Sequence, residues 1–87
     1  GTDGFNKNGF MSNNLMRAEA IRTMSENAKR VIILTESVKF TQTGVVSLFP
    51  LSAVDSVFTD DGIPADAAQI LHSQDTHVYT VSTGNDE

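Results

Sequence analysis

Residues 31–35 read VIILT, a short run of β-branched and aliphatic residues that decides the fold class. No polar residue alternates with the apolar ones before Thr35. Such a run is typical of a parallel strand that is covered on both faces. The polar stretch 36–44 that follows is expected to form a loop.

Helical and strand-like segments alternate on either side of this run. Asn13 and Asn14 are N-cap candidates before a helix predicted over 15–29. A turn at 50–54 leads into a predicted strand at 56–59, a helix at 64–74 and a strand at 77–81. Because alternating strands and helices need crossover connections, we predict an α/β fold, a three-layer α/β/α arrangement with a parallel sheet. Residues 1–82 are expected to form one partial domain, and residues 83–87 a disordered tail.

Composition and charge exclude several classes of protein. The chain has 87 residues, enough for one small domain and too few for a large enzyme. It has no cysteine, so disulfides and thiolate metal sites are excluded, and no apolar run approaches the roughly 20 residues of a membrane span. All six basic residues lie in the first half, whereas residues 46–87 hold seven acids and no Lys or Arg. This distribution argues against direct binding of nucleic acid by the chain.

Two adjacent carboxylates, Asp60 and Asp61, follow the predicted strand at 56–59. Parallel sheets bind ligands at the carboxyl ends of their strands, and the TES run at 35–37 marks the end of another strand. One interpretation is therefore a polar ligand crevice at this edge. In the alternative, Asp61 caps the following turn and Asp60 is merely solvated, and the local sequence does not choose between the two.

The order of five segments resembles the C-terminal effector domain of DeoR-type bacterial repressors of sugar catabolism. The segments are GTDGF (1–5), GFMSNNLMRAE (9–19), VIILTESVKF (31–40), PLSAVD (50–55) and TDDGIP (59–64). The resemblance implies a cytoplasmic sensor of a phosphorylated sugar, with an isomerase/CoA-transferase-like fold and no cofactor. It also implies that the chain corresponds to the second half of the effector domain. DNA would then be bound only by a helix-turn-helix N-terminal to it.

An enzyme is the main alternative, because the same fold family includes sugar-phosphate isomerases. The resemblance to those isomerases is weaker at the residues that carry the chemistry. Gly4 stands where they have an acid, and the loop at 9–12 contains no lysine. Proton transfer on a sugar phosphate needs a positioned base and an electrophile. We therefore expect that the chain is not an enzyme.

The candidate ligand-binding residues have distinct expected roles. Ionised carboxylates are pure acceptors suited to sugar hydroxyls, and a lysine suits a phosphate or relieves repulsion between the paired aspartates. Glu19 is either a ligand contact or a residue that interacts favourably with the helix dipole, and the second role is favoured. Ser12 is either a ligand contact or a helix cap, and the cap is favoured. The residues are Asp3, Asp60 and Asp61, with Lys39, Glu19 and Ser12.

Two histidines and a possible strand edge are the remaining candidate features of the sequence. His72 and His77 flank the end of the second predicted helix, but without cysteines nearby a metal site is disfavoured. An incomplete parallel sheet would leave an exposed strand edge, so we expect the chain to self-associate, and an oligomerisation module is a third possible function.

Overall fold

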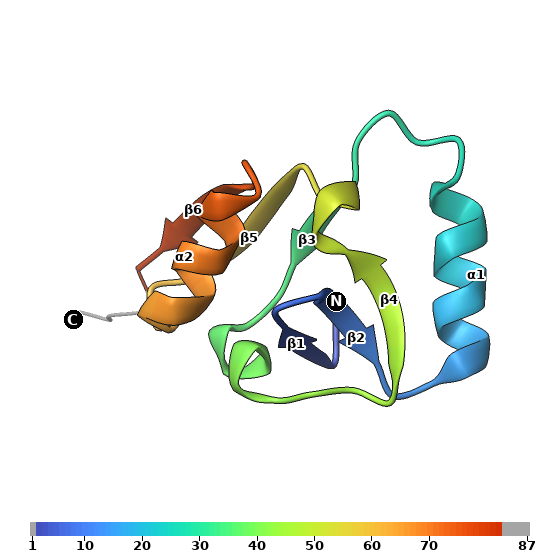
Figure 1. Cartoon of the computed structure of the whole chain (residues 1–87), viewed down its shortest axis with the longest axis horizontal. Helices are drawn as coiled ribbons and strands as arrows, with labels where there is room; N and C mark the ends of the chain where they lie inside the picture. The colour runs from blue at the N-terminus through green and yellow to red at the C-terminus, as the bar shows by residue number, and fades with distance from the viewer. Residues whose placement is uncertain (1, 83–87) are drawn as a thin grey trace.

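The computed structural model describes residues 2–82, which form two three-stranded sheets placed side by side along a body of 41 × 24 × 23 Å (Figure 1). One sheet is antiparallel and contains strands β1, β2 and β4, and the other is parallel and contains strands β3, β5 and β6. The fold is therefore mixed α/β. The expected disordered tail, 83–87, lies outside the described residues.

The antiparallel sheet begins with a tight hairpin between β1 (Gly4–Asn6) and β2 (Gly9–Ser12). The Asn6 side chain accepts a hydrogen bond from the backbone N–H of Asn8, which stabilises the two-residue turn. Gly9 closes this turn at a φ of 141°, and a Cβ there would lie 2.2 Å from the carbonyl oxygen of Phe49. The third strand, β4 (Val46–Pro50), pairs with β2.

This antiparallel sheet corrects the prediction of a single parallel sheet. Its strands are only three to five residues long, and β2 and β4 are separated by more than thirty residues of chain. A cluster of three aromatic side chains with ring centroids 5.0 to 6.0 Å apart packs on the hairpin. These rings belong to Phe5, Phe10 and Phe40. Because both β4 and Phe40 come from segments distant from the hairpin, no local pattern marks this sheet.

Helix α1 (Leu15–Ser25) packs beside the antiparallel sheet, on β4 and β2 (Figure 1). Asn14 is its N-cap, as predicted, with its side chain accepting from the N–H of Arg17 at 2.9 Å. The helix ends at Ser25, four residues before the predicted end. It buries Ala18 and packs Ile21 against the core.

The parallel sheet consists of β3 (Ile32–Leu34), β5 (Ser56–Asp60) and β6 (His77–Val81), in the order β3-β5-β6. Helix α2 (Ala65–Ser73) covers one face of it and buries Ala67 and Leu71 in the same cluster as Val57 of β5. These elements agree with the prediction to within one residue, except that β3 is shorter. Two 3-10 helices, η1 (Ser37–Thr41) and η2 (Leu51–Ala53), lie within the expected loop at 36–44 and the expected turn at 50–54.

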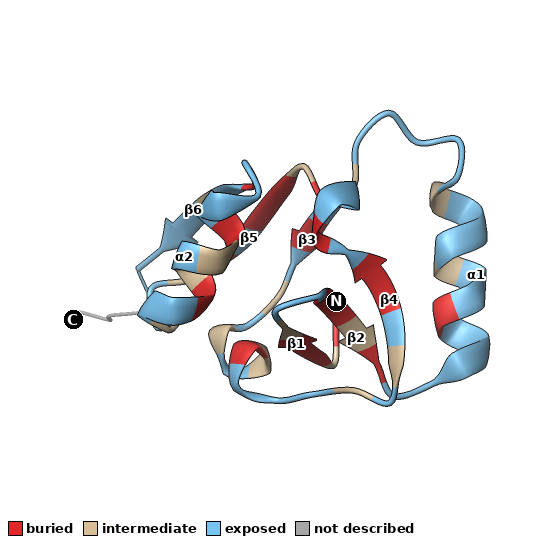
Figure 2. Cartoon of the chain, in the orientation of Figure 1, coloured by how far each residue is buried: buried red, intermediate tan, exposed pale blue. Residues whose placement is uncertain are grey.

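The other face of the parallel sheet is open, which corrects the prediction of three layers. Ile32 and Leu34 of β3 are exposed, so this strand is covered on one face only (Figure 2). The physical reason is the position of α1, which packs on β4 instead of on the parallel sheet. An apolar strand sequence shows that burial is favourable, but not which element supplies it.

Candidate functional site

The carboxyl ends of the parallel strands meet at one edge of the sheet, as predicted. The backbone ladder continues beyond β3 and β5, because Thr35 donates to the carbonyl of Phe58 at 3.1 Å and Asp61 donates to that of Val81 at 3.0 Å. Asp60 is paired in register with Val81. The paired aspartates and the 35–37 run therefore lie at the same edge.

The Asp60 carboxylate joins two loops at this edge. Its Oδ2 accepts from the backbone N–H of Ser37 at 2.8 Å, and its Oδ1 accepts from the N–H of Gly62 at 2.9 Å. The Ser37 hydroxyl hydrogen bond, together with these two N–H groups, holds the pKa of Asp60 below its ordinary value. Asp60 is thus an ionised group with a fixed orientation.

Gly62 is required by this close approach. A Cβ at position 62 would lie 2.8 Å from Ser37 Oγ and 3.0 Å from Asp60 Oδ1. Asp61, between the two, is exposed. The structure therefore gives the turn-bracing role to Asp60, which differs from the alternative in which that residue is merely solvated.

A second carboxylate, Asp3, has the same kind of bonding in the antiparallel half. Its Oδ2 accepts from the N–H of Asn13 at 2.8 Å and from the Ser12 hydroxyl at 3.4 Å. The Asn13 hydrogen bond is the main cause that lowers the pKa of Asp3, and desolvation opposes it. The positive charge of Arg17, the Ser12 hydroxyl and the charge of Lys39 each lower the pKa further by a smaller amount. Arg17 was not among the expected residues, and only the tertiary structure brings it to Asp3.

Ser12 has a different role from the favoured one, which corrects the expectation. Its Oγ accepts from the N–H of Asn14 at 3.1 Å and can donate to Asp3. The helix cap itself is Asn14. The serine is buried and braces the entry of the chain into α1.

Helix η1 lies between these two carboxylates and connects them. Ser37 at its start binds Asp60, and the charge of Lys39 in its middle acts on Asp3. Phe40 of η1 packs in the aromatic cluster, and the carbonyl of Gln42 accepts from the N–H of Phe5. The 3-10 helix is therefore fixed in place, and with it the positions of its polar side chains. Lys39 was expected to offer its charge to a phosphate or to the carboxylates, and among the carboxylates its charge acts on Asp3.

A shallow hollow of about 380 Å³ lies next to Asp60 at the carboxyl edge. Its apolar side is formed by Leu34, Phe58 and Val81, and its polar side includes Glu36 and Asp60. A concave surface with an apolar floor and a few polar groups is the usual form of a small-molecule site. The sequence indicated the polar groups but not the apolar floor.

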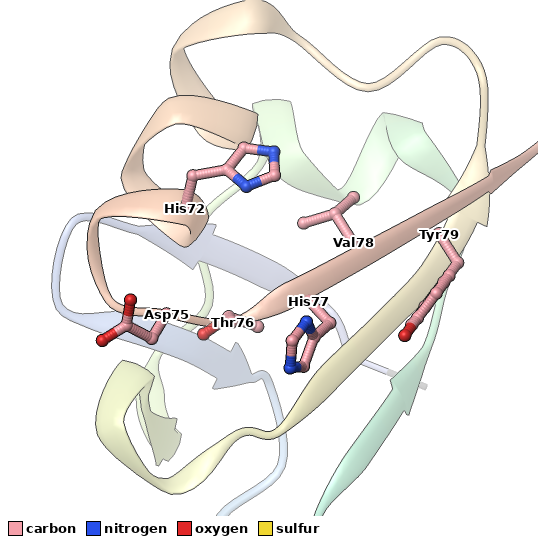
Figure 3. Close-up of a pocket in the computed structure, with 6 residues that line it drawn as sticks. All are labelled: His72, Asp75, Thr76, His77, Val78 and Tyr79. Atoms are coloured by element: carbon pink, nitrogen blue, oxygen red, sulfur yellow. The ribbon is translucent and has the colours of Figure 1, made fainter.

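Other residues lie apart from this edge. Glu19 is exposed on α1, whose contacts are with β4 and β2. His72 and His77 line a separate hollow beside α2 and β6 (Figure 3). Among residues 2–82, no group of three or more His, Asp or Glu side chains could hold a metal ion. No helix in the same residues is long and apolar enough to cross a membrane.

The fold is mixed α/β, with polar residues gathered at the carboxyl edge of its parallel sheet. The DeoR C terminal sensor domain family matches residues 1–61, and the chain belongs to this family. The resemblance seen in the sequence is thereby confirmed. The family is a regulatory one, so the expectation that the chain is not an enzyme is also confirmed.

Two curated relatives match the chain over 73 residues each. The "Putative aga operon transcriptional repressor" of Escherichia coli O157:H7 is 32% identical, over 84% of this chain and 27% of that protein. The "L-fucose operon activator" of Haemophilus influenzae is 30% identical, over 83% of this chain and 29% of that protein. The chain thus spans less than a third of the length of these relatives. No solved structure gives a significant match.

Proposed function

We propose that this chain is the ligand-sensing part of a cytoplasmic DeoR-type transcriptional repressor of sugar metabolism, and that it binds a phosphorylated sugar in the whole protein. The proposal is supported by membership of a sensor domain family and by the two relatives, whose names refer to operon regulation. DNA would be bound by another part of such a protein, since residues 46–87 carry no Lys or Arg.

The observation that carries the proposal is that η1 connects two positive charges, which act on Asp3 in the antiparallel half, with the fixed carboxylate of Asp60. On one side Lys39 and Arg17 lie within electrostatic range of Asp3. On the other side Asp60 is held by the N–H groups of Ser37 and Gly62. A sugar phosphate has the matching polarity, with a dianionic group at one end and hydroxyl donors at the other.

The fixed carboxylate of Asp60 is suited to the hydroxyl end of such a ligand. A carboxylate has about four lone-pair sites; two of them are used by backbone N–H groups and a third by the Ser37 hydroxyl. The remaining site can accept from a sugar hydroxyl without a change in the carboxylate's orientation. Asp61, exposed beside it, is proposed to contribute further acceptors, and the apolar floor of the hollow a surface for the sugar's C–H groups.

An NMR titration of the nitrogen-15-labelled chain with a panel of ligands tests the proposal. The panel contains phosphorylated pentoses, hexoses, amino sugars and 6-deoxyhexoses, each with its unphosphorylated form. A binding ligand is expected to shift the amide signals of Ser37, Lys39 and Gly62, and to lose about tenfold or more in affinity when its phosphate is removed.

Three variants locate the site. Asp60→Asn and Lys39→Ala are each expected to weaken binding by about tenfold. Lys29→Ala removes the same kind of charge from the 26–31 loop, which lines a different hollow, and should leave binding unchanged. Equal losses in Lys39→Ala and Lys29→Ala, or signal shifts remote from η1, would contradict the proposed site.

A further inference from the structure

A hollow of about 220 Å³ lies between the antiparallel half of the molecule and helix α2. Three segments that are far apart in the sequence line it: the β1–β2 hairpin, the 3-10 helix η1 and helix α2 (Figure 1). None of its lining residues lines the carboxyl-edge hollow beside Asp60. This hairpin–helix hollow is therefore a separate concave surface, and the long-range packing of the chain creates it.

The floor of the hairpin–helix hollow is apolar and held in place. Phe5 and Phe40 are only 5% and 7% exposed, and their rings meet edge to face with centroids 5.0 Å apart. Both rings also pack on Phe10, which is fully buried. Ile70 of α2 adds a partly buried aliphatic side chain. An apolar group that enters the hollow thus meets a preformed surface and does not have to order it.

Two opposite charges lie at the rim. Lys7 comes from the turn of the hairpin and Asp66 from the first turn of α2, and both are exposed. Within residues 2–82, the ammonium group of Lys7 forms no ion pair or hydrogen bond. Asp66 Oδ1 accepts from the N–H of Ala67 at 2.9 Å, which leaves the other carboxylate oxygen open. One cation and one anion are therefore available to a ligand.

Asn6 supplies a neutral donor to the same hollow. Its Oδ1 accepts from the N–H of Asn8 at 2.8 Å, and its Nδ2 donates to Met11 Sδ at 3.2 Å. These two bonds fix the orientation of the amide. Because an asparagine amide carries two N–H donors, one remains for a ligand.

The charges and the volume limit the class of ligand. A dianionic phosphate group would be repelled by Asp66, and a simple cation by Lys7. A small zwitterion can bind both residues at once. The volume of 220 Å³ is below the roughly 300–1,000 Å³ of sites for drug-sized ligands, so the ligand is a small one. The apolar floor requires that it also carries an apolar group.

We propose that the hairpin–helix hollow binds a free α-amino acid with an apolar side chain. The carboxylate of the ligand accepts from Lys7 and from the remaining N–H of Asn6, and its ammonium group donates to Asp66. The apolar side chain lies on the rings of Phe5 and Phe40. Since the charged rim is exposed to water, the affinity is low, with a Kd on the order of 1 mM.

A ligand in this hollow would connect the hairpin to α2 and act on η1. Phe40 belongs to η1, and Ser37 of the same 3-10 helix donates to Asp60 at the carboxyl edge. The amino acid would therefore stabilise the position of η1 without entering the carboxyl-edge hollow. The inference does not depend on the proposed effector, and its test contains no sugar phosphate.

An NMR titration of the nitrogen-15-labelled whole chain with L-phenylalanine, between about 0.1 and 20 mM, tests the proposal. The amide signals of Asn6, Lys7, Phe40 and Ala67 are expected to shift together. Free glycine has no side chain for the floor and is expected to bind at least about tenfold more weakly. Phenylalanine amide lacks the carboxylate and N-acetylphenylalanine lacks the ammonium group, so each should bind at least about threefold more weakly.

Three variants assign the two charges. Lys7→Ala is expected to remove the difference in affinity between phenylalanine and its amide. Asp66→Asn keeps the acceptor for Ala67 and is expected to remove the difference between phenylalanine and its N-acetyl derivative. Lys29→Ala is the matched control, because it removes the same kind of charge from the 26–31 loop and should leave every affinity unchanged. The same spectra show whether each variant is folded.

Four results would overturn the inference. No shift at about 20 mM phenylalanine would mean that the hollow has no useful affinity. Shifts centred on Phe58 and Tyr79 would place the ligand on the open face of the parallel sheet. Equal affinities for phenylalanine and both derivatives would mean that neither charge is recognised. Differences that persist in folded Lys7→Ala and Asp66→Asn would mean that other residues recognise the charges.

Discussion

The two sheets of this chain differ in how completely other elements cover them. Substitutions in the more completely covered sheet are therefore expected to cost more stability. In the antiparallel half, a hairpin of a few residues is fixed by three packed phenylalanines and by α1. In the parallel half, α2 covers one face, while the other face and the carboxyl edge remain accessible (Figure 2). The antiparallel half is therefore the more completely packed one, and the parallel half has the larger accessible apolar surface.

The largest test of this comparison replaces one phenylalanine in each half. Phe10→Ala removes a fully buried ring from the aromatic cluster and is expected to lower the free energy of unfolding by about 3–4 kcal/mol. Phe58→Ala removes a ring that is partly exposed and stacked on Tyr79, and is expected to cost about 1 kcal/mol. Urea unfolding in dilute solution measures both. Equal losses would show that the parallel sheet is as fully packed as the antiparallel one.

A glycine in each half gives a second, smaller contrast. Gly9→Ala forces a side chain into a positive φ and against the backbone of Phe49, and we expect a loss of about 2–3 kcal/mol. Gly62→Ala meets the ends of the Ser37 and Asp60 side chains, which can move, so a loss of about 1 kcal/mol is expected. Thermal unfolding distinguishes the two. A larger effect at Gly62 would place the more rigid backbone in the parallel half.

The lowered pKa values of Asp3 and Asp60 predict how the stability of the fold depends on pH. Hydrogen bonds lower the pKa of Asp3 and of Asp60 in the folded state, so each carboxyl binds its proton less tightly in the folded chain than in the unfolded one. Their contribution is therefore complete above the unfolded pKa of about 4 and is lost as the pH falls through the folded value. Melting temperatures between about pH 6 and 2.5 should fall accordingly.

Variants at the edge of the sheet sharpen this pH prediction. Asp60→Asn should reduce the fall in melting temperature toward acid pH and lower the melting temperature at neutral pH by a few degrees. Ser37→Ala removes the hydroxyl that contributes most to the lowered pKa of Asp60 and should have an intermediate effect. An unchanged pH profile in Asp60→Asn would mean that this hydrogen-bonded brace does not stabilise the folded state.

The smallest expected effect concerns a buried hydroxyl in the parallel half. Thr59 Oγ1 is buried and has no hydrogen-bond partner among the described residues. Thr59→Val keeps the shape and removes the polar atom, so we expect a gain of about 0.5–1 kcal/mol in the free energy of unfolding. The same substitution at Thr76, whose hydroxyl donates to the carbonyl of Val54, should be destabilising. A loss of stability in Thr59→Val would indicate that its hydroxyl is satisfied.

Local signals in the sequence determined the parallel half with little error. The helix at Ala65–Ser73 follows Gly62 and Pro64, and the strand at His77–Val81 was predicted with its observed bounds. The same signals placed Asp60 and Asp61 at the end of a strand, where the structure has them. Glycine and proline mark where helices and strands end, and a short β-branched run marks a strand. Both are properties of neighbouring residues, so they can be recognised without knowledge of the fold.

Only the tertiary structure decided the antiparallel sheet, the position of α1 and the open sheet face. The partner of β2 comes from more than thirty residues away, and the aromatic cluster gathers Phe5, Phe10 and Phe40 from segments that share no local pattern. The proximity of Arg17 and Lys39 to Asp3 has the same origin. The spacing of apolar residues indicates which side chains favour burial. It does not indicate which element buries them, because the hydrophobic effect is non-directional. What covers each surface is therefore settled by long-range packing.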